Sequence, residues 1–202
     1  MPDGQIFNAL IDFFEEDDWE FTWLDGSPIL SMGFSGKNGK WMCYAQARED
    51  QHQFVFYSVC PINAPKHRRH AVAEFITRAN YGMIIGNFEM DFEDGEIRYK
   101  TSIDVEGASL LPPLVKQMVY SNVLITDRYL PGLMRIIYGN VSPSAEIERI
   151  ESEAFPLLDD EEDSPDDGEF EDDDELYDLN GEDFDEDDID DEPPHTNGSS
   201  PN

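Results

Sequence analysis

Apolar and polar residues alternate with two different periods up to about residue 150, and each period is typical of one type of element. Close to the N-terminus the spacing is helical, with Asp3 placed to cap the first turn and Phe14 as the last apolar position. The apolar face of this predicted helix consists of Ile6, Leu10, Phe13 and Phe14. Four consecutive acidic residues follow at 15–18. They would lie at the negative end of the helix dipole, so we expect the helix to end before them.

A period of two then predicts four β-strands. Their approximate positions are 19–23, 30–34, 41–48 and 54–60. The segments between them are short and contain Gly, Asn, Asp and Pro, which are turn-forming residues. Short turns between consecutive strands predict an antiparallel meander.

Helical spacing returns after the meander. A second helix is expected to open at 63–65, with Pro65 near its first position, and to end at 80–82. Its apolar face consists of Val72, Phe75 and Ile76.

The segment 83–104 has the pattern of a β-hairpin, with Asp94-Gly95 as a two-residue loop in which Gly accepts a positive φ. That loop fixes the register, because two apolar pairs and two pairs of opposite charge then coincide. The expected pairs are Phe92 with Ile97, Met90 with Tyr99, Asp91 with Arg98, and Glu89 with Lys100.

The chain becomes helical again after Gly107. Ser109 is a candidate cap, the prolines at 112–113 are tolerated in a first turn, and Pro131 indicates a kink or a restart after Thr126. A last short helix is expected at 144–152. The predicted fold class is α+β: one antiparallel sheet with helices packed on one face, in the order α-β-β-β-β-α-β-β-α.

Charge divides the chain in two. All 13 Lys and Arg residues lie at or before Arg149, whereas 25 of the 46 acidic residues lie in 150–202. We therefore expect an α+β domain at 1–152 and a disordered acidic tail at 153–202, because such a composition cannot build a core. Apolar residues punctuate the tail, so it is either a partner-binding segment or only a solubilising one.

The same charge bears on partners and location. Net charge of −33 disfavours direct binding to nucleic acid or to an anionic membrane, because their phosphates would be repelled. The acidic N-terminus lacks the basic region of a secretory signal, and no apolar run approaches the ~20 residues of a membrane helix. These features predict a cytoplasmic protein.

Several short motifs are candidates for binding or catalysis, and each has a simpler structural interpretation. Gly36-Lys37-Asn38-Gly39-Lys40 resembles a phosphate-binding loop only superficially, since Trp41 follows where Ser or Thr is required. A hairpin turn is the better interpretation. The acidic segment 174–187 lacks the spacing of a calcium loop. Carboxylates at 91–96 are expected to be solvated at a hairpin tip.

Histidines and cysteines give no firmer site. His67 and His70 would share one helix face, with Glu74 one turn further, but a solvated basic face or a docking patch for an acidic segment explains the cluster at 66–70 better than a metal site. Cys43 and Cys60 have no zinc-type spacing and are expected to be reduced, half-buried strand residues, with a bridge left open. We predict no catalytic residue, no metal and no cofactor.

Two stretches carry a resemblance to a known family: FITRANYGMIIGNFEMDFEDGEIRYKTSIDVEG at 75–107 and ITDRYLPGLMRIIYGN at 125–140. The order of helix, GNFE hairpin and DRYLP segment resembles the YbjN family, also labelled a bacterial sensory transduction regulator. The resemblance covers about 4–140. It implies a fold similar to type III secretion chaperones, often dimeric, and it implies no catalytic residues.

The function hypothesis that follows is a noncatalytic protein-interaction module, either chaperone-like or a regulatory adaptor. Its partner would be another protein, a basic one if the tail takes part, or a second copy of the chain. The alternative is an enzyme or small-ligand-binding domain with a site between sheet and helices. A third hypothesis is a scavenger of basic proteins that acts through the tail.

Overall fold

The structure is a computed structural model that describes residues 4–153, so the predicted disordered tail at 153–202 lies outside the described residues apart from Glu153. The elements are α1 (Gln5–Glu16), β1 (Phe21–Trp23), β2 (Ile29–Ser35), β3 (Lys40–Arg48), η1 (Glu49–Gln51), β4 (Gln53–Val59), α2 (Arg69–Tyr81), β5 (Asn87–Met90), β6 (Ile97–Asp104), α3 (Pro112–Tyr138) and α4 (Pro143–Ser152). The predicted α+β class and element order are confirmed, with α4 as the short last helix.

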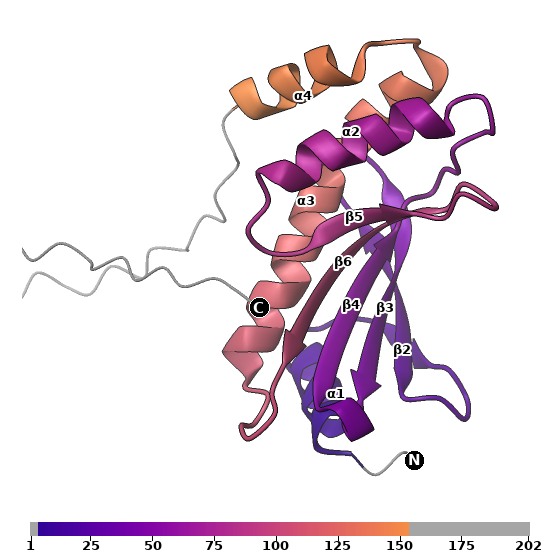
Figure 1. Ribbon diagram of the computed structural model, residues 1–202. Coiled ribbons are helices and arrows are strands. Elements are labelled where there is room, and N and C mark those ends of the chain that lie inside the picture. The colour runs from indigo at the N-terminus through magenta and orange to yellow at the C-terminus, as the bar shows by residue number, and fades with distance from the viewer. Residues whose placement is uncertain (1–3, 154–202) are drawn as a thin grey trace, which may run out of the picture. The chain divides into compact units, whose positions relative to one another are not determined.

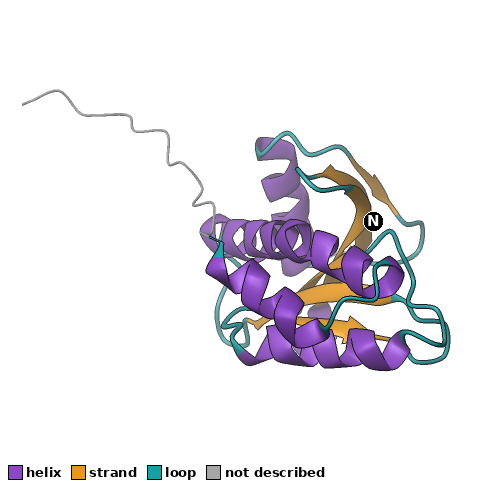
Figure 2. Cartoon of the chain, turned by 90° about the horizontal axis from the view of Figure 1, so that it is seen from above, coloured by secondary structure: helices purple, strands orange, loops and turns teal. Residues whose placement is uncertain are grey.

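The six strands form one antiparallel sheet in the order β1-β2-β3-β4-β6-β5 (Figure 1). The first four are the predicted meander. Seen from above, the helices lie together against the curved sheet (Figure 2). Because side chains alternate between the faces, Ala45, Phe56 and Tyr99 turn towards the helices and are buried. The helices therefore pack on one face, as predicted.

The core consists of two clusters of buried side chains joined by α3. The first lies among α1, the meander and the N-terminal half of α3, and contains Phe14 and Phe56. The second lies among α2, α4, the β5–β6 hairpin and the C-terminal half of α3, and contains Phe75 and Tyr99. Each large apolar side chain buried in this way contributes about 1.5–3 kcal/mol to folding.

Helix α1 begins at Gln5 and runs to Glu16, two residues beyond the predicted end at Phe14. Its N-cap residue, Gly4, offers no side chain, and the expected cap, Asp3, lies outside the described residues. The cap comes instead from Glu49, whose carboxylate accepts the backbone N–H of Phe7 at 2.8 Å and that of Ile6 at 3.4 Å. A negative charge at this end also favours the helix dipole.

Helix α2 begins at Arg69, so the predicted start at 63–65 is wrong. The backbone before it is already engaged. Cys60 N–H donates to Ile97 at 2.8 Å and Ala64 N–H donates to Gly95 at 2.7 Å, which holds this segment against the hairpin. Pro65 opens a turn that Arg68 N–H closes.

Helix α3 is continuous from Pro112 to Tyr138, so the predicted cap at Ser109 and restart after Thr126 are both wrong. Leu111 is the N-cap residue, and Pro131 lies inside the helix. A proline has no N–H to donate to the carbonyl four residues earlier, that of Asp127. The Asn38 side-chain amide donates to this oxygen instead, at 3.0 Å.

The loop between β2 and β3 is thereby tied to α3. The Asp127 carboxylate also accepts the backbone N–H groups of Asn38 at 2.7 Å and Lys37 at 3.1 Å. A side chain on Gly36 would clash with that carboxylate, so glycine permits the close approach. The segment 36–40 is a hairpin turn docked on a helix.

The β5–β6 hairpin is present, but its predicted register is wrong by two residues. The observed pairs are Met90 with Ile97, Glu89 with Arg98, Phe88 with Tyr99, and Asn87 with Lys100. A longer connection at 91–96 replaces the two-residue loop, because the carboxylates of Asp91 and Asp94 accept backbone N–H groups within it. Gly95 does have the expected positive φ, 83°. A shift of two keeps every side chain on its predicted face.

Both cysteines are free and buried, Cys43 on β3 and Cys60 just after β4. The prediction of reduced thiols is confirmed, although both are fully rather than half buried. Burial raises the pKa of each thiol to about 12, so both stay protonated at neutral pH.

Candidate interaction face of the sheet

The sheet face opposite the helices presents aromatic, apolar and charged side chains side by side. We call it the open face, since no described helix packs on it. The register aligns its side chains in rows across the strands. One row is Ser31, Tyr44, Tyr57, Lys100 and Asn87, and the next is Gly33, Met42, Val59, Arg98 and Glu89.

The rows give the open face two adjoining stripes. The central strands β3 and β4 present an apolar and aromatic stripe that includes Met42, Tyr44, Tyr57 and Val59. Met42 is 45% exposed, which is high for a side chain of this kind at the centre of a sheet. Strand β6 presents the cations Arg98 and Lys100 beside it. Such a surface suits a partner that brings both apolar and polar groups.

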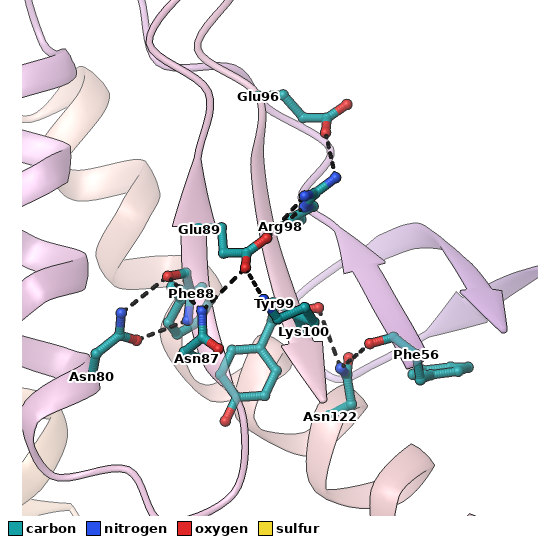
Figure 3. A network of polar contacts seen from close by, with 10 residues as sticks. All are labelled: Phe56, Asn80, Asn87, Phe88, Glu89, Glu96, Arg98, Tyr99, Lys100 and Asn122. Carbon is teal, nitrogen blue, oxygen red and sulfur yellow. Dashed lines mark hydrogen bonds and ion pairs between the residues drawn. The ribbon is translucent and has the colours of Figure 1, made fainter. Parts of the chain in front are cut away.

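Glu89 holds the cationic stripe in place (Figure 3). Its carboxylate accepts the Arg98 Nε–H at 2.9 Å and also a hydrogen bond from the Lys100 ammonium group. Burial alone would raise the pKa of Glu89, but the two cations outweigh it and lower that pKa. The Arg98 guanidinium also lies 4.6 Å from the centre of the Tyr57 ring, a cation–π contact.

A polar hollow of about 220 Å³ opens at one end of the face. Its lining residues are Arg48, Gln53, Val55, Tyr57, Lys100, Ser102, Ile103 and Asp104. Backbone N–H of Glu106 and the Gln53 amide lower the pKa of Asp104, so this carboxyl is ionised at neutral pH. The hollow extends the open face with hydrogen-bonding groups.

Both edges of the sheet are poorly suited to strand addition. The edge strand β1 has three residues. At the other edge, the Asn80 side chain accepts the Phe88 N–H at 2.8 Å and donates to the Phe88 carbonyl at 3.0 Å (Figure 3). Asn80 thus pairs with Phe88 as a neighbouring strand would, which blunts the edge. Because both edges are blunted, the open face is a better surface for a partner than either edge.

The basic cluster at 66–70 does not form one solvated helix face. His67 lies in the turn before α2 and His70 lies inside the helix. Arg68 donates to Asn140 at 2.8 Å, while Arg69 donates to backbone carbonyls of Ala64 and of the 91–96 connection. The two arginines therefore fasten loops together.

The metal hypothesis gains no support from this arrangement. Glu74, its third candidate ligand, pairs with Arg78 at 2.9 Å. Within residues 4–153, no group of three or more His, Cys, Asp or Glu side chains gathers closely enough to hold a metal ion. No helix in that part of the chain is both long and apolar enough to cross a membrane.

Sequence reasoning missed two features of this site. It predicted Lys100 as a neighbour of Glu89 but missed Arg98, because the predicted register of the β5–β6 hairpin was shifted by two residues. It also gave no role to Asn80, which was treated only as a helix end. An amide side chain at the end of a helix, able both to donate and to accept a short distance before a strand, was the available signal.

Comparison with known proteins decides the family. The family model described as "Putative bacterial sensory transduction regulator", YbjN, matches residues 7–134. The chain belongs to the YbjN family. The expected resemblance is confirmed over most of the predicted range, while α4 lies beyond the matched residues. No curated protein matches the sequence.

Among the solved structures that are similar to this YbjN-family chain are the following three. YbjN from E. coli is 8% identical, with a TM-score of 0.45, covering 71% of this chain and 92% of the other. The ExsC–ExsE complex is 10% identical, with a TM-score of 0.47, and the match covers 64% of this chain and 93% of the other. The HopA1–SchA chaperone–effector complex is 15% identical, with a TM-score of 0.40, and the match covers 61% of this chain and 92% of the other.

Proposed function

We propose that the protein is a noncatalytic interaction module, a regulatory adaptor or chaperone, that binds another protein on the open face. The observation that carries this proposal is the stripe of exposed Met42 and half-buried Tyr44, Tyr57 and Val59 at the centre of a sheet whose two edges are blunted. Aromatic residues and Met are the side chains that protein interfaces favour.

Charge supports a protein partner over a nucleic acid. With a net charge of −33, the chain would repel phosphates at long range and attract a partner of basic net charge. The tail would take part in that attraction. A second copy of the chain is a weaker candidate for the open face, because two copies would bring cationic stripes and like net charges together.

The alternative is an enzyme or a small-ligand-binding domain with its site between sheet and helices. Asn122 occupies the middle of that space, where its amide donates to the Phe56 and Tyr99 carbonyls at 3.1 and 3.2 Å (Figure 3). These bonds fasten α3 to β4 and β6, which favours a packed interior. The interaction module remains our conclusion.

A pull-down from cell extract tests the proposal. Wild-type chain and a Met42→Ser/Tyr57→Ser variant are compared, with Leu111→Ser as a control for losing an exposed apolar side chain, 55% exposed at the start of α3. We expect a partner to bind the wild type and the control and to be lost from the open-face variant. Repeating the capture without residues 153–202 measures the share of the tail.

If the protein is noncatalytic, the residues most open to a catalytic role should be dispensable. Single changes to alanine at His52, His67, His70 and Glu74 should leave partner capture and cellular function intact. A variant of this set that abolished function while keeping its fold and its partner would contradict the proposal, and so would a substrate that the protein turns over.

A further inference from the structure

The open face has the opposite charge balance to the described domain as a whole. Residues 4–153 contain 22 Asp and Glu against 13 Lys and Arg. At the open-face positions of the six strands the balance is reversed, because four cations stand there with two acids. The cations are Lys40, Arg48, Arg98 and Lys100, and the acids are Glu89 and Asp104. Within an acidic domain, this face therefore attracts negative charge.

Two of the cations lie at opposite ends of β3. Lys40 is the first residue of the strand and Arg48 the last, and both are exposed on the side of Met42 and Tyr44. Among residues 4–153, neither of them has an ion-pair partner. A strand of this length spans about 27 Å. The apolar centre of the face thus has an unpaired cation at each end.

The two cations of β6 share one carboxylate. Arg98 and Lys100 both contact Glu89 (Figure 3), so this group of three has one positive charge in excess. A second acid, Glu96, approaches Arg98 only at 3.9 Å. The Arg98 and Lys100 side chains remain 41% and 29% exposed. A carboxylate that binds beside them would meet donors that are already held in place.

The polar hollow brings the two groups of cations together. Arg48 lines it from β3 and Lys100 from β6, with Tyr57 on the strand between them. Its acid, Asp104, already accepts hydrogen bonds from the Gln53 amide at 3.2 Å and from the Glu106 N–H at 2.9 Å. Arg48 therefore offers its charge here to an acid from outside the domain.

We infer that the open face binds an extended segment of a partner protein that is acidic at its ends and apolar or aromatic in its middle. The inference rests on the proposed function and names the chemistry of the partner. The apolar side chains of the segment would cover Met42 and Tyr57, and its Asp and Glu side chains would meet the cations. The partner as a whole can still have a basic net charge, because only the contacting segment needs to be acidic.

Two other occupants suit the face less well. Single-stranded nucleic acid would stack its bases on Tyr44 and Tyr57, but a long phosphate chain is repelled by a net charge of −33. A short acidic segment brings fewer charges and more apolar side chains. A second copy of the chain would bring the same four cations against each other.

Binding of a model peptide tests the inference. The probe is a fluorescently labelled peptide of about ten residues, the length that spans β3, with Leu and Tyr in the middle and Glu at both ends. A peptide with Lys in place of Glu is the charge control. Both are titrated into the full chain, into Lys40→Glu/Arg48→Glu, the open-face charge variant, and into Lys66→Glu/Lys116→Glu, the control charge variant. Lys66 and Lys116 are exposed and lie outside the sheet, so both variants change the net charge equally.

The inference requires the Glu peptide to bind the wild type and the control charge variant alike. It must bind the open-face charge variant and Met42→Ser/Tyr57→Ser at least about tenfold more weakly. Binding should also weaken when salt rises from about 50 to about 200 mM. Equal binding to the two charge variants would overturn the inference, since net charge and not the face would then set the affinity. Absence of binding to the wild type would overturn it as well.

Two further outcomes separate this inference from the proposed function. A Lys peptide that binds the wild type but not Met42→Ser/Tyr57→Ser would leave the open face as a protein-binding surface and overturn only the acidic segment. An oligothymidylate that displaces the Glu peptide at a lower concentration than the unlabelled peptide does would assign the face to nucleic acid, and both proposals would then fail. Partner capture in the pull-down decides the proposed function independently.

Discussion

Gly95 is under two separate constraints at the residue scale. Its φ of 83° lies in the region that favours glycine, and a side chain there would clash with the Ala64 carbonyl oxygen. Gly26 has a similar φ, 77°, with nothing near its open side. A comparison of the two glycines therefore distinguishes the cost of a strained backbone from the cost of a steric clash.

We therefore predict that Gly95→Ala destabilises the protein by more than Gly26→Ala. The strained backbone alone should cost about 1 kcal/mol at either position, and the clash should add at least as much at Gly95. Chemical denaturation of both variants measures the difference. Equal losses would mean that the 91–96 connection can move away from Ala64 without cost.

The two thiols lead to a second prediction at this scale. Because burial raises the pKa of Cys43 and Cys60 to about 12, neither forms the reactive thiolate in the folded protein at pH 8. Iodoacetamide should leave both unmodified under native conditions and should modify both in denaturant, as measured by intact mass. Rapid native modification of either would show that its strand opens readily.

At the element scale, the Asn80 side chain occupies the outer edge of β5 and so hinders another strand from pairing there. Asn80→Ala would leave the N–H and C=O of Phe88 without their present partners, at a cost of about 1–2 kcal/mol. An open edge also invites pairing with another chain, so we expect concentration-dependent self-association in sedimentation velocity.

Asn87→Ala is the matched control, because Asn87 makes only longer hydrogen bonds, of 3.3 and 3.5 Å, to Phe88 and Glu89. It should remain monodisperse to the same extent as the wild type. An Asn80→Ala variant that behaved identically would show that α2 itself shields the edge.

Elements were predictable wherever the pattern was local. The strands of the meander and the face of every hairpin residue follow from a period of two, which is why Phe88 and Tyr99 were assigned to the correct side. Boundaries failed where a distant partner decides them. Pro131 looked like a break, because the Asn38 amide that replaces its missing hydrogen bond lies about 90 residues away. The composition of the open face likewise depends on which strands become neighbours. The spacing of residues within one segment does not predict the order of strands in the sheet.

At the scale of the whole described domain, α4 adds a part beyond the residues that match the family. It is attached by the buried side chains of Ile147 and Ile150 and by Glu146, which is 1% exposed. The Glu146 carboxylate pairs with Arg135 at 3.0 Å and with Arg149 at 2.6 Å. Its hydrogen bond is the main cause that raises the pKa of Arg149. One buried acid thus connects α4 to α3.

We predict that Glu146→Gln destabilises the protein by about 1–2 kcal/mol and speeds amide exchange in α4. The loss should stay below the several kcal/mol typical of fully buried pairs, because both arginines can turn to water. Glu148→Gln, an exposed acid of the same helix, should change stability by less than about 0.5 kcal/mol. Exchange rates in α4 that match the wild type would contradict this role.

The cap on α1 has a consequence for biosynthesis. Ribosomes make the chain from its N-terminus, so Phe7 emerges 42 residues ahead of the Glu49 carboxylate that receives its N–H. A helix of 12 residues without a cap is marginal in water. During that interval its face of Phe and Leu residues is available to any nascent-chain binder, and the helix gains its cap only after Glu49 has been made.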